Sequence, residues 1–442
     1  MLRLRSSLAP ICLAALGLAC KPPAITDGDE GTDDVDTSST GTEDTTSTID
    51  TDTVGTETNG TTGGPTCATA LDILVVLDNS GSMGEAQRRL VDGIAGLIDP
   101  LDQAGVDWRL GVTTSDNGNP WCPAGTTTPE AGKLVLSSCK DRMGDFIFGD
   151  SVDDRDLACN EICNLDSNQV TPIPTTTEFD PQPKPRPWLE QSGGVSNLPA
   201  GTDMIDALGC LLPQGVNGCG FESQLESMYL SLVRSVTTNE SNYGFIRSDA
   251  SLLVLIVSDE VDCSYNKQWD SIFQQDGNKV FWADPNDSFP TSALCWNAGV
   301  TCTGDPGAYD SCLATNYDVN GNVTADENAA VLHPLSRYQG LLQGLQVDKQ
   351  SINPDARIYV GLLAGVGEAG QISYAEPVDP QLDHDFGIEY ACSDGTISGL
   401  PPVRMRETSE ALGGGPNVRK SICASSYAPG LSELVGFFTS GC

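Results

Sequence analysis

The chain has 442 residues, of which 39% are hydrophobic, so it is long enough to bury the core of one large domain or of two ordinary ones. It carries 61 acidic residues against 23 basic ones, which gives a formal net charge of -38. This charge repels nucleic acids and anionic lipid surfaces and favours cations and basic partners, so nucleic-acid binding is excluded.

Residues 1–19 have the pattern of an export signal. Arg3 and Arg5 precede an apolar run from Leu8 to Ala19, which is too short to span a bilayer, and the segment leads into LGLAC. This ending is similar to a bacterial lipobox, except that Gly17 stands three residues before Cys20, where leucine is usual. We expect cleavage before Cys20 and lipid attachment to its sulfur. The alternative is ordinary cleavage nearby, with Cys20 left as a free or paired thiol.

Residues 20–66 are predicted to be the lipidated cysteine followed by a tether. The stretch from Ile25 to Thr66 is rich in threonine and has eleven acidic residues, no basic residue and no aromatic residue. Such a composition cannot bury enough apolar surface to order itself. We therefore expect an exported lipoprotein of the outer membrane or cell surface, facing either the exterior or the periplasm, whose only contact with the membrane is the lipid.

From Cys67 onward the pattern is that of an α/β domain. Apolar runs of strand length lack strict alternation, as is typical of parallel strands covered on both faces; they span 71–77, 108–114, 251–257 and 356–363. Amphipathic segments predict helices over 85–101, 202–212, 222–237, 334–345 and 430–439. The alternation of strands and helices predicts right-handed crossovers and a doubly wound, mostly parallel, Rossmann-like sheet.

Two long stretches, at about 115–201 and 259–333, interrupt this alternation, and each carries several cysteines. We interpret them as disulfide-rich insertions in a single domain that covers residues 67–442. Disulfides can order long segments that lack a core of their own.

The cysteine count fits a disulfide framework. Of the 16 cysteines, Cys12 lies in the signal and Cys20 is the lipid site, which leaves an even number in an exported chain. Cys67 precedes the first predicted strand and Cys442 ends the chain, so a bridge between them would clamp the domain where the tether pulls on it. The other pairings stay open.

The stretch LDILVVLDNSGSMGE, residues 71–85, joins the first predicted strand to the first predicted helix. Asp78, Ser80 and Ser82 have the spacing D-x-S-x-S and supply one carboxylate and two hydroxyl oxygens from a tight turn. Oxygen ligands suit Mg²⁺, Ca²⁺ or Mn²⁺ better than zinc or copper. The alternative, a cap for the helix that follows, explains one of these residues but not the triplet.

A second aspartate, Asp259, follows the predicted strand 251–257 in the stretch LLVLIVSDEVDCS. Ligands of doubly wound sheets bind outside the carboxyl ends of the strands. We therefore expect Asp78 and Asp259 to meet at one site.

These motifs resemble the von Willebrand factor type A (vWA) domain. Its metal-ion-dependent adhesion site (MIDAS) combines D-x-S-x-S after the first strand, a threonine in a second loop and an aspartate after the fourth strand. The resemblance covers about residues 66–442 if the insertions are allowed. It implies that Asp78, Ser80, Ser82 and Asp259 bind a divalent cation, Mg²⁺ before Ca²⁺ or Mn²⁺. It also implies a protein or acidic-glycan ligand whose carboxylate completes the coordination, which is adhesion without catalysis.

The sequence departs from the vWA pattern at the threonine. The segment 217–228 offers Glu222 and Ser223 in its place. Glu222 either brings a further carboxylate toward the ion or is a favourable acidic residue in the first turn of a helix.

Other signals are weaker. DVNGNVTADE, residues 318–327, resembles a calcium loop of the EF-hand type, but its glycine is misplaced and Ala329 stands where the closing glutamate belongs, so an Asn-Gly hairpin turn explains it better. The chain has only two histidines and no HExxH or G-x-S-x-G motif, and we interpret His384 as a solvated loop residue.

Two rival hypotheses stay open. The first is a structural or assembly module of the cell envelope with a vestigial metal site. The second is a secreted metal-dependent hydrolase, which needs a general base near Asp78 that the sequence does not identify.

Overall fold

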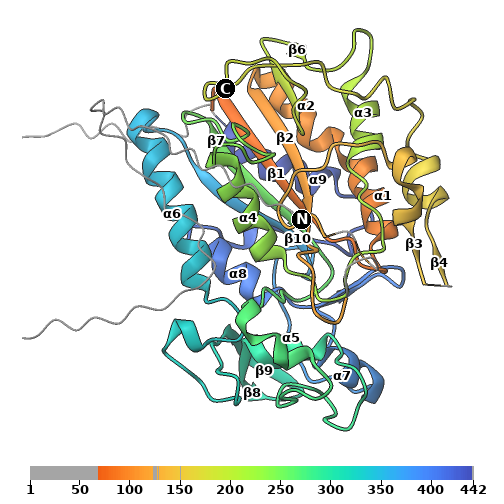
Figure 1. The fold of residues 1–442 in the computed structure, drawn as a ribbon, viewed down its shortest axis with the longest axis vertical. Coiled ribbons are helices and arrows are strands. Elements are labelled where there is room, and N and C mark those ends of the chain that lie inside the picture. The colour runs from red at the N-terminus through yellow and green to blue at the C-terminus, as the bar shows by residue number, and fades with distance from the viewer. Residues whose placement is uncertain (1–67, 123–126, 128, 150, 441–442) are drawn as a thin grey trace, which may run out of the picture. The chain divides into compact units, whose positions relative to one another are not determined.

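The structure, a computed structural model, describes residues 68–122, 127, 129–149 and 151–440 (Figure 1). The expectations for the signal, for Cys20 and the tether, and for a bridge between Cys67 and Cys442 lie outside the described residues.

A seven-stranded sheet forms the centre of the fold, in the order β13-β10-β7-β1-β2-β5-β6 (Figure 1). All neighbours from β13 to β2 pair in parallel, and β5 and β6 continue the sheet in antiparallel fashion. The strands are β1 (Ala70–Leu77), β2 (Asp107–Thr114), β5 (Leu189–Ser192), β6 (Val195–Ser196), β7 (Ser251–Val257), β10 (Ile358–Ala364) and β13 (Arg419–Ser421). The predicted mostly parallel sheet is confirmed, and the four predicted strands correspond to β1, β2, β7 and β10.

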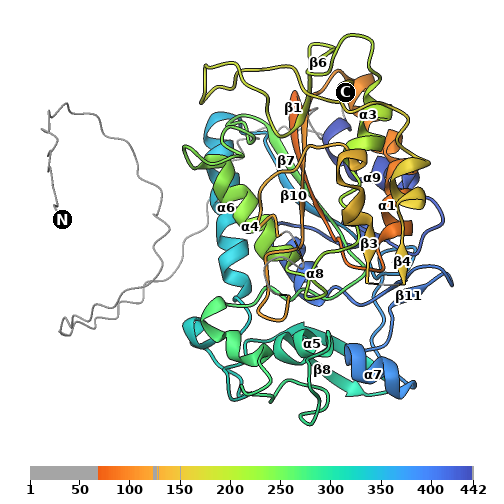
Figure 2. The ribbon, with the colours of Figure 1, turned by 45° about the vertical axis from the view of Figure 1, so that its right-hand side comes forward.

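Helices cover both faces of this sheet, as expected for a doubly wound arrangement (Figures 1 and 2). Alternate residues of β1 point to opposite faces: Leu71 and Ile73 pack in a buried cluster with α1, α2 and α9, whereas Leu74 and Val76 pack with α4, α6 and α8. The helices are α1 (Gly84–Gly93), α2 (Ala95–Ala104), α3 (Met204–Leu211), α4 (Gln224–Val236), α5 (Ala293–Gly299), α6 (Leu335–Ile352), α7 (Pro380–Phe386), α8 (Val403–Glu410) and α9 (Ala428–Thr439).

The helix predicted over 85–101 is divided into α1 and α2, which meet at Ile94. Gly96 lies beside this junction, and a Cβ atom there would be 2.3 Å from the carbonyl oxygen of Ala428. The backbone of α9 therefore packs directly against α2, an approach that only glycine allows.

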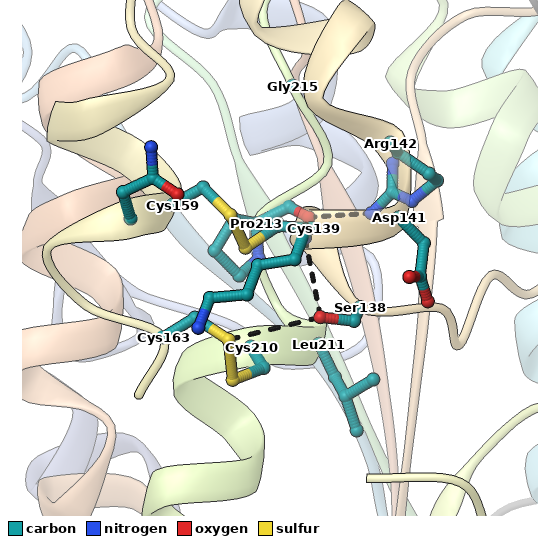
Figure 3. Close-up of a disulfide and its surroundings, with 12 residues drawn as sticks. Ser138, Cys139, Asp141, Arg142, Cys159, Cys163, Cys210, Leu211, Pro213 and Gly215 are labelled. Carbon is teal, nitrogen blue, oxygen red and sulfur yellow. Dashed lines mark hydrogen bonds between the residues drawn. A yellow bond between two sulfur atoms is a disulfide. The ribbon is translucent and has the colours of Figure 1, made fainter. Parts of the chain in front are cut away.

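The stretch at about 115–201 has two parts. Its end supplies β5 and β6, which extend the central sheet beyond β2. The remainder, with the small hairpin of β3 (Ile147–Phe148) and β4 (Val152–Asp153), is held by the disulfides Cys139–Cys159, Cys163–Cys210 and Cys122–Cys219. Figure 3 shows the first two side by side, with Arg142 donating to the carbonyl of Pro213 over 2.8 Å.

The stretch at about 259–333 builds a separate small cluster of buried aromatic and aliphatic residues. It contains α5 and the antiparallel pair β8 (Val300–Asp305) and β9 (Ala308–Ala314), with the disulfides Cys263–Cys295 and Cys302–Cys312. Figures 1 and 2 show α5, β8 and β9 beside α7, beyond one end of the central strands.

A sixth disulfide, Cys392–Cys423, ties the pair β11 (Cys392–Ser393) and β12 (Ser398–Gly399) to the segment that follows β13. These six bridges indicate that the chain folds in an oxidising compartment after export. Within the described residues, no helix has the length and apolar composition needed to cross a membrane.

Candidate functional site

The two predicted strand-end aspartates meet because β1 and β7 are adjacent parallel strands, with Leu77 opposite Val257. The backbone N–H of Asp78 donates to the carbonyl of Val257 over 2.9 Å, and the Ser258 hydroxyl donates to Asp78 Oδ2 over 2.5 Å. The next residue, Asp259, is therefore presented at the same edge of the sheet.

The turn after β1 places two hydroxyl groups near these aspartates. The backbone N–H of Ser80 donates to Asp78 Oδ1 over 2.8 Å, and the hydroxyls of Ser80 and Ser82 lie 3.2 Å apart. The Ser82 side chain lies close enough to Asp259 to offset part of the rise in the pKa of its carboxyl, and both residues line the same cavity. The N-cap of α1 is Met83, without a side-chain cap, so the capping alternative for the triplet is wrong.

The donor set fits a hard divalent cation in its chemistry. An octahedral ion with ligands at about 2.1 Å places neighbouring ligands about 3 Å apart, which matches the two serine hydroxyls. Asp259 is only 6% exposed, and its Oδ1 has no hydrogen-bond partner. No group of three or more His, Cys, Asp or Glu side chains suited to a metal occurs in the described part of the chain, so a cation here would depend on the hydroxyls as well as the carboxylates.

The electrostatics of the site disfavour bare negative charge. Burial raises the pKa of Asp78, and burial together with the charge of Asp78 raises the pKa of Asp259 to about 8. The pKa values of Glu222 and Glu260 are raised well above the usual range, first by burial and then by the neighbouring carboxylates. A bound cation would reverse these shifts by stabilising the ionised forms.

Glu222 lies before α4, which begins at Gln224, and the acidic residue in the first turn of that helix is Glu226. The helix-turn alternative for Glu222 is therefore wrong. The Ser115 hydroxyl donates to Glu222 Oε2, whereas Oε1 is buried without a partner. Ser223 does not reach the site through its hydroxyl, which donates to the carbonyl of Cys263 over 3.0 Å.

Two glycines allow the turn after β1 to be closely covered. A Cβ atom on Gly81 would lie 2.8 Å from the ring of Phe148, which belongs to β3. A Cβ atom on Gly218 would lie 2.3 Å from the side-chain oxygen of Asn79. The loop before α4 and the β3–β4 hairpin therefore hold the turn from two sides.

A cavity of about 880 Å³ opens above Ser80, Ser82 and Asp259. Its walls come from the β3–β4 hairpin, from residues 289–292, from the end of α7 and from the segment 396–400. Its lining includes aromatic and acidic side chains besides Asp259; they are Phe148, Phe289, Phe386, Tyr390, Glu260 and Asp385.

Sequence reasoning missed several of these residues. Glu260 could have been found, because it directly follows Asp259 in the same strand-end loop. The Ser258 hydroxyl donates to Asp78 because β1 and β7 end side by side, and the Ser115 hydroxyl, which follows β2, donates to Glu222 in the loop before α4. Tyr390 carries no local signal, since it reaches the rim from a distant part of the chain.

His384 was interpreted as a solvated loop residue; its side chain is 31% exposed, but the residue is helical and not in a loop. It lies in α7, where Nε2 is 2.6 Å from Asp287 Oδ2 and Nδ1 is 2.8 Å from Asp385 Oδ1. These two carboxylates hold the imidazole in place and raise its pKa.

The hairpin interpretation of the stretch 318–327 is confirmed. Tyr317 and Val323 form an antiparallel bridge, and the backbone N–H of Asp318 donates to the carbonyl of Asn322 over 2.8 Å. Gly321 has φ of 80°, as turns of this kind require.

No family model and no curated protein matches the chain. Among solved structures, it is similar to the pilus adhesin SpaC from Lactobacillus rhamnosus GG in its open conformation, with 10% identity and a TM-score of 0.29 over 84% of this chain. A second structure of the same adhesin gives 12% identity and a TM-score of 0.28 over 84% of this chain. The match covers 30% of the adhesin chain in both cases.

Proposed function

We propose that this protein is a non-catalytic, cation-dependent binding protein of the vWA type. In this proposal Asp78, Ser80, Ser82 and Asp259 hold a divalent cation, Mg²⁺ before Ca²⁺ or Mn²⁺. The ion then binds a carboxylate of a protein or acidic-glycan ligand. The observation that carries the proposal is the Asp259 carboxylate, which is buried on the cavity floor beside the hydroxyl of Ser82 and has an unpartnered oxygen.

The charge balance supports adhesive binding through the ion. Two protein carboxylates neutralise a divalent cation, and neutral hydroxyls leave it Lewis-acidic toward a further oxygen ligand. The cavity above the serines is large enough for a ligand side chain to reach that position.

Glu222 takes the place of the vWA threonine in this proposal. Its Oε1 is buried without a partner, and a cation beside Asp78 would favour the ionised form of this carboxyl, whose pKa burial and the neighbouring carboxylates otherwise raise. We expect the site to bind cations more strongly with Glu222 than it would with a neutral residue at this position.

The anchoring is part of the same proposal. The six disulfides among residues 68–440 support export, and Cys20 would carry the lipid that attaches the chain to the outer membrane or cell surface.

Calorimetric titration of the purified protein with Mg²⁺, Mn²⁺ and Ca²⁺ tests the site. We expect binding that is lost in Asp78→Ala and retained in Asp92→Ala, a matched control whose carboxylate is exposed on α1. If the wild-type protein binds none of these ions, the proposal fails and the envelope module with a vestigial site becomes the better account.

A further inference from the structure

Two exposed aromatic rings lie together at the edge of the cavity above the candidate cation site. Phe289 lines the cavity, and its ring centroid is 6.2 Å from that of Trp121, with the two ring planes tilted by 32°. Phe289 is 51% exposed and Trp121 is 42% exposed. Burial of large aromatic side chains is favourable, so two such rings that meet solvent side by side are a candidate contact surface for a ligand.

The two rings come from the two insertions, and both are tied to the loop before α4. Trp121 is next to Cys122, whose disulfide partner Cys219 directly precedes the lining residue Gly220. The segment that carries the other ring is held at the same point, because the Ser292 hydroxyl donates to the carbonyl of Gly220 over 3.1 Å. The pair of rings is therefore positioned beside the cavity by the fold.

A third exposed ring lies directly beside the turn that would hold the ion. Phe148 lines the cavity, and a Cβ atom on Gly81, between Ser80 and Ser82, would lie 2.8 Å from its ring. The cavity therefore offers aromatic surface both beside the serines and at its edge.

The polar part of the lining consists of oxygen atoms. Every polar side chain there is a hydroxyl or a carboxyl group, and none carries a nitrogen; all of these residues lie in the described part of the chain. The Thr291 hydroxyl donates to the carbonyl of His384 over 2.7 Å, and the Ser292 hydroxyl donates to that of Gly220. These two hydroxyls present acceptor lone pairs to a ligand, and the carboxyl groups add further acceptor oxygens. The lining therefore favours a ligand rich in hydrogen-bond donors.

Sugars match both features of the cavity. The faces of a sugar ring are C–H groups, which pack against the negative face of an aromatic ring. Its hydroxyl groups can each donate to an acceptor oxygen of the lining. A peptide main chain instead brings carbonyl groups that need donors, and a carbonyl buried without a donor is costly. The lining therefore favours a glycan over a peptide.

We propose that the ligand of this protein is an acidic glycan, in which a uronic-acid carboxylate binds the cation and a neighbouring neutral sugar stacks on Trp121 and Phe289. The inference rests on the proposed function, because the cation holds the carboxylate. It goes further by choosing a glycan over a protein ligand and by giving a role to two rings that belong to the insertions.

The test measures the affinity of the purified protein for a hyaluronan hexasaccharide, in which glucuronate alternates with a neutral amino sugar. Calorimetry is performed in Mg²⁺ at physiological ionic strength. We expect binding that is lost in excess EDTA, and at least tenfold weaker binding of a capped peptide with a single aspartate. Trp121→Ala and Phe289→Ala should each weaken hexasaccharide binding about fivefold to tenfold, whereas Trp121→Phe should stay within about threefold of the wild type.

Phe179→Ala is the matched control. Phe179 is 44% exposed and its ring centroid lies 6.1 Å from that of Tyr243, so it belongs to a similar exposed pair, but neither residue lines the cavity. This variant should bind the hexasaccharide with wild-type affinity, which separates a local effect of the two rings from a general effect of removing an exposed aromatic side chain.

Four results would overturn the inference while leaving Mg²⁺ binding, and with it the proposed function, intact. The first is no binding of the hexasaccharide by a protein that binds Mg²⁺. The second is binding of the aspartate peptide as tightly as the hexasaccharide or more tightly. The third is an unchanged hexasaccharide affinity in both Trp121→Ala and Phe289→Ala, and the fourth is hexasaccharide binding that persists in EDTA. Absence of Mg²⁺ binding, by contrast, would contradict the proposed function itself.

Discussion

Without a cation, the stability of this protein should fall as pH rises from about 4 to about 8. Burial and the charge of Asp78 raise the pKa of Asp259 from 3.8 to about 8. An acid whose pKa is higher in the folded state than in the unfolded state binds its proton more tightly when the protein is folded. Its contribution to stability is therefore full below the unfolded pKa and is lost as pH rises to the folded pKa. Asp78, Glu222 and Glu260 are shifted in the same direction.

The size of the effect follows from Asp259 alone. Each tenfold change in a protonation equilibrium corresponds to about 1.4 kcal/mol, so the difference between 3.8 and about 8 corresponds to a loss on the order of 5 kcal/mol. Asp180 and Asp394 do not obscure the window, because hydrogen bonds and basic partners lower their pKa values to about 2.

Urea unfolding with intact disulfides, followed by circular dichroism in a chelator across this pH range, measures the loss. Asp259→Asn should flatten the profile, and Mg²⁺ should flatten the profile of the wild-type protein, because the ion stabilises the carboxylates in their ionised form. A wild-type profile in chelator that stays level or rises between these pH values would refute the electrostatic reasoning.

Three further predictions concern the support of the site. Gly218→Ala should weaken Mg²⁺ binding in calorimetry, because the added Cβ would lie 2.3 Å from the Asn79 side chain and displace the turn; an unchanged affinity would count against this contact. Arg404→Met should lower the free energy of unfolding by about 3 to 5 kcal/mol in urea titrations. The reason is that Arg404 Nε lies 2.9 Å from Asp262 Oδ2, and its removal leaves Asp262 as a buried charge without its ion-pair partner. A loss below about 1 kcal/mol would contradict the prediction. Protonated His384 should stabilise the wild-type protein fully below pH 6.5, and this stabilisation should be lost as pH rises through the raised pKa of His384. In Mg²⁺, the thermal stability of His384→Gln should therefore lack this decline. Identical pH profiles of thermal stability for the two proteins would disprove the prediction.

The sheet was predictable because its strands are buried on both faces. Runs such as 251–257 are apolar throughout, and β7 is buried at every position, so the sequence pattern and the packing coincide. The helix α8 was missed because its buried face includes Arg404 and Thr408, whose side chains are satisfied by hydrogen bonds and do not show as hydrophobic periodicity.

The candidate site was predictable as far as local sequence defines it. Asp78 and Asp259 each follow an apolar strand, and the adjacency of those strands brings them together. Glu222 could be noticed but not interpreted, because its role depends on where α4 begins. The aromatic and acidic rim comes from segments that are distant in sequence and was not foreseen. The bridge between Cys67 and Cys442 stays a prediction.

The most direct test of the central claim is a crystal structure of the protein grown in Mn²⁺, with anomalous scattering data that locate the ion. The account predicts one strong anomalous peak about 2.1 to 2.3 Å from the hydroxyl oxygens of Ser80 and Ser82, at the cavity floor beside Asp259. A fully formed turn with no anomalous peak there, at a Mn²⁺ concentration that saturates any binding seen in solution, would contradict it.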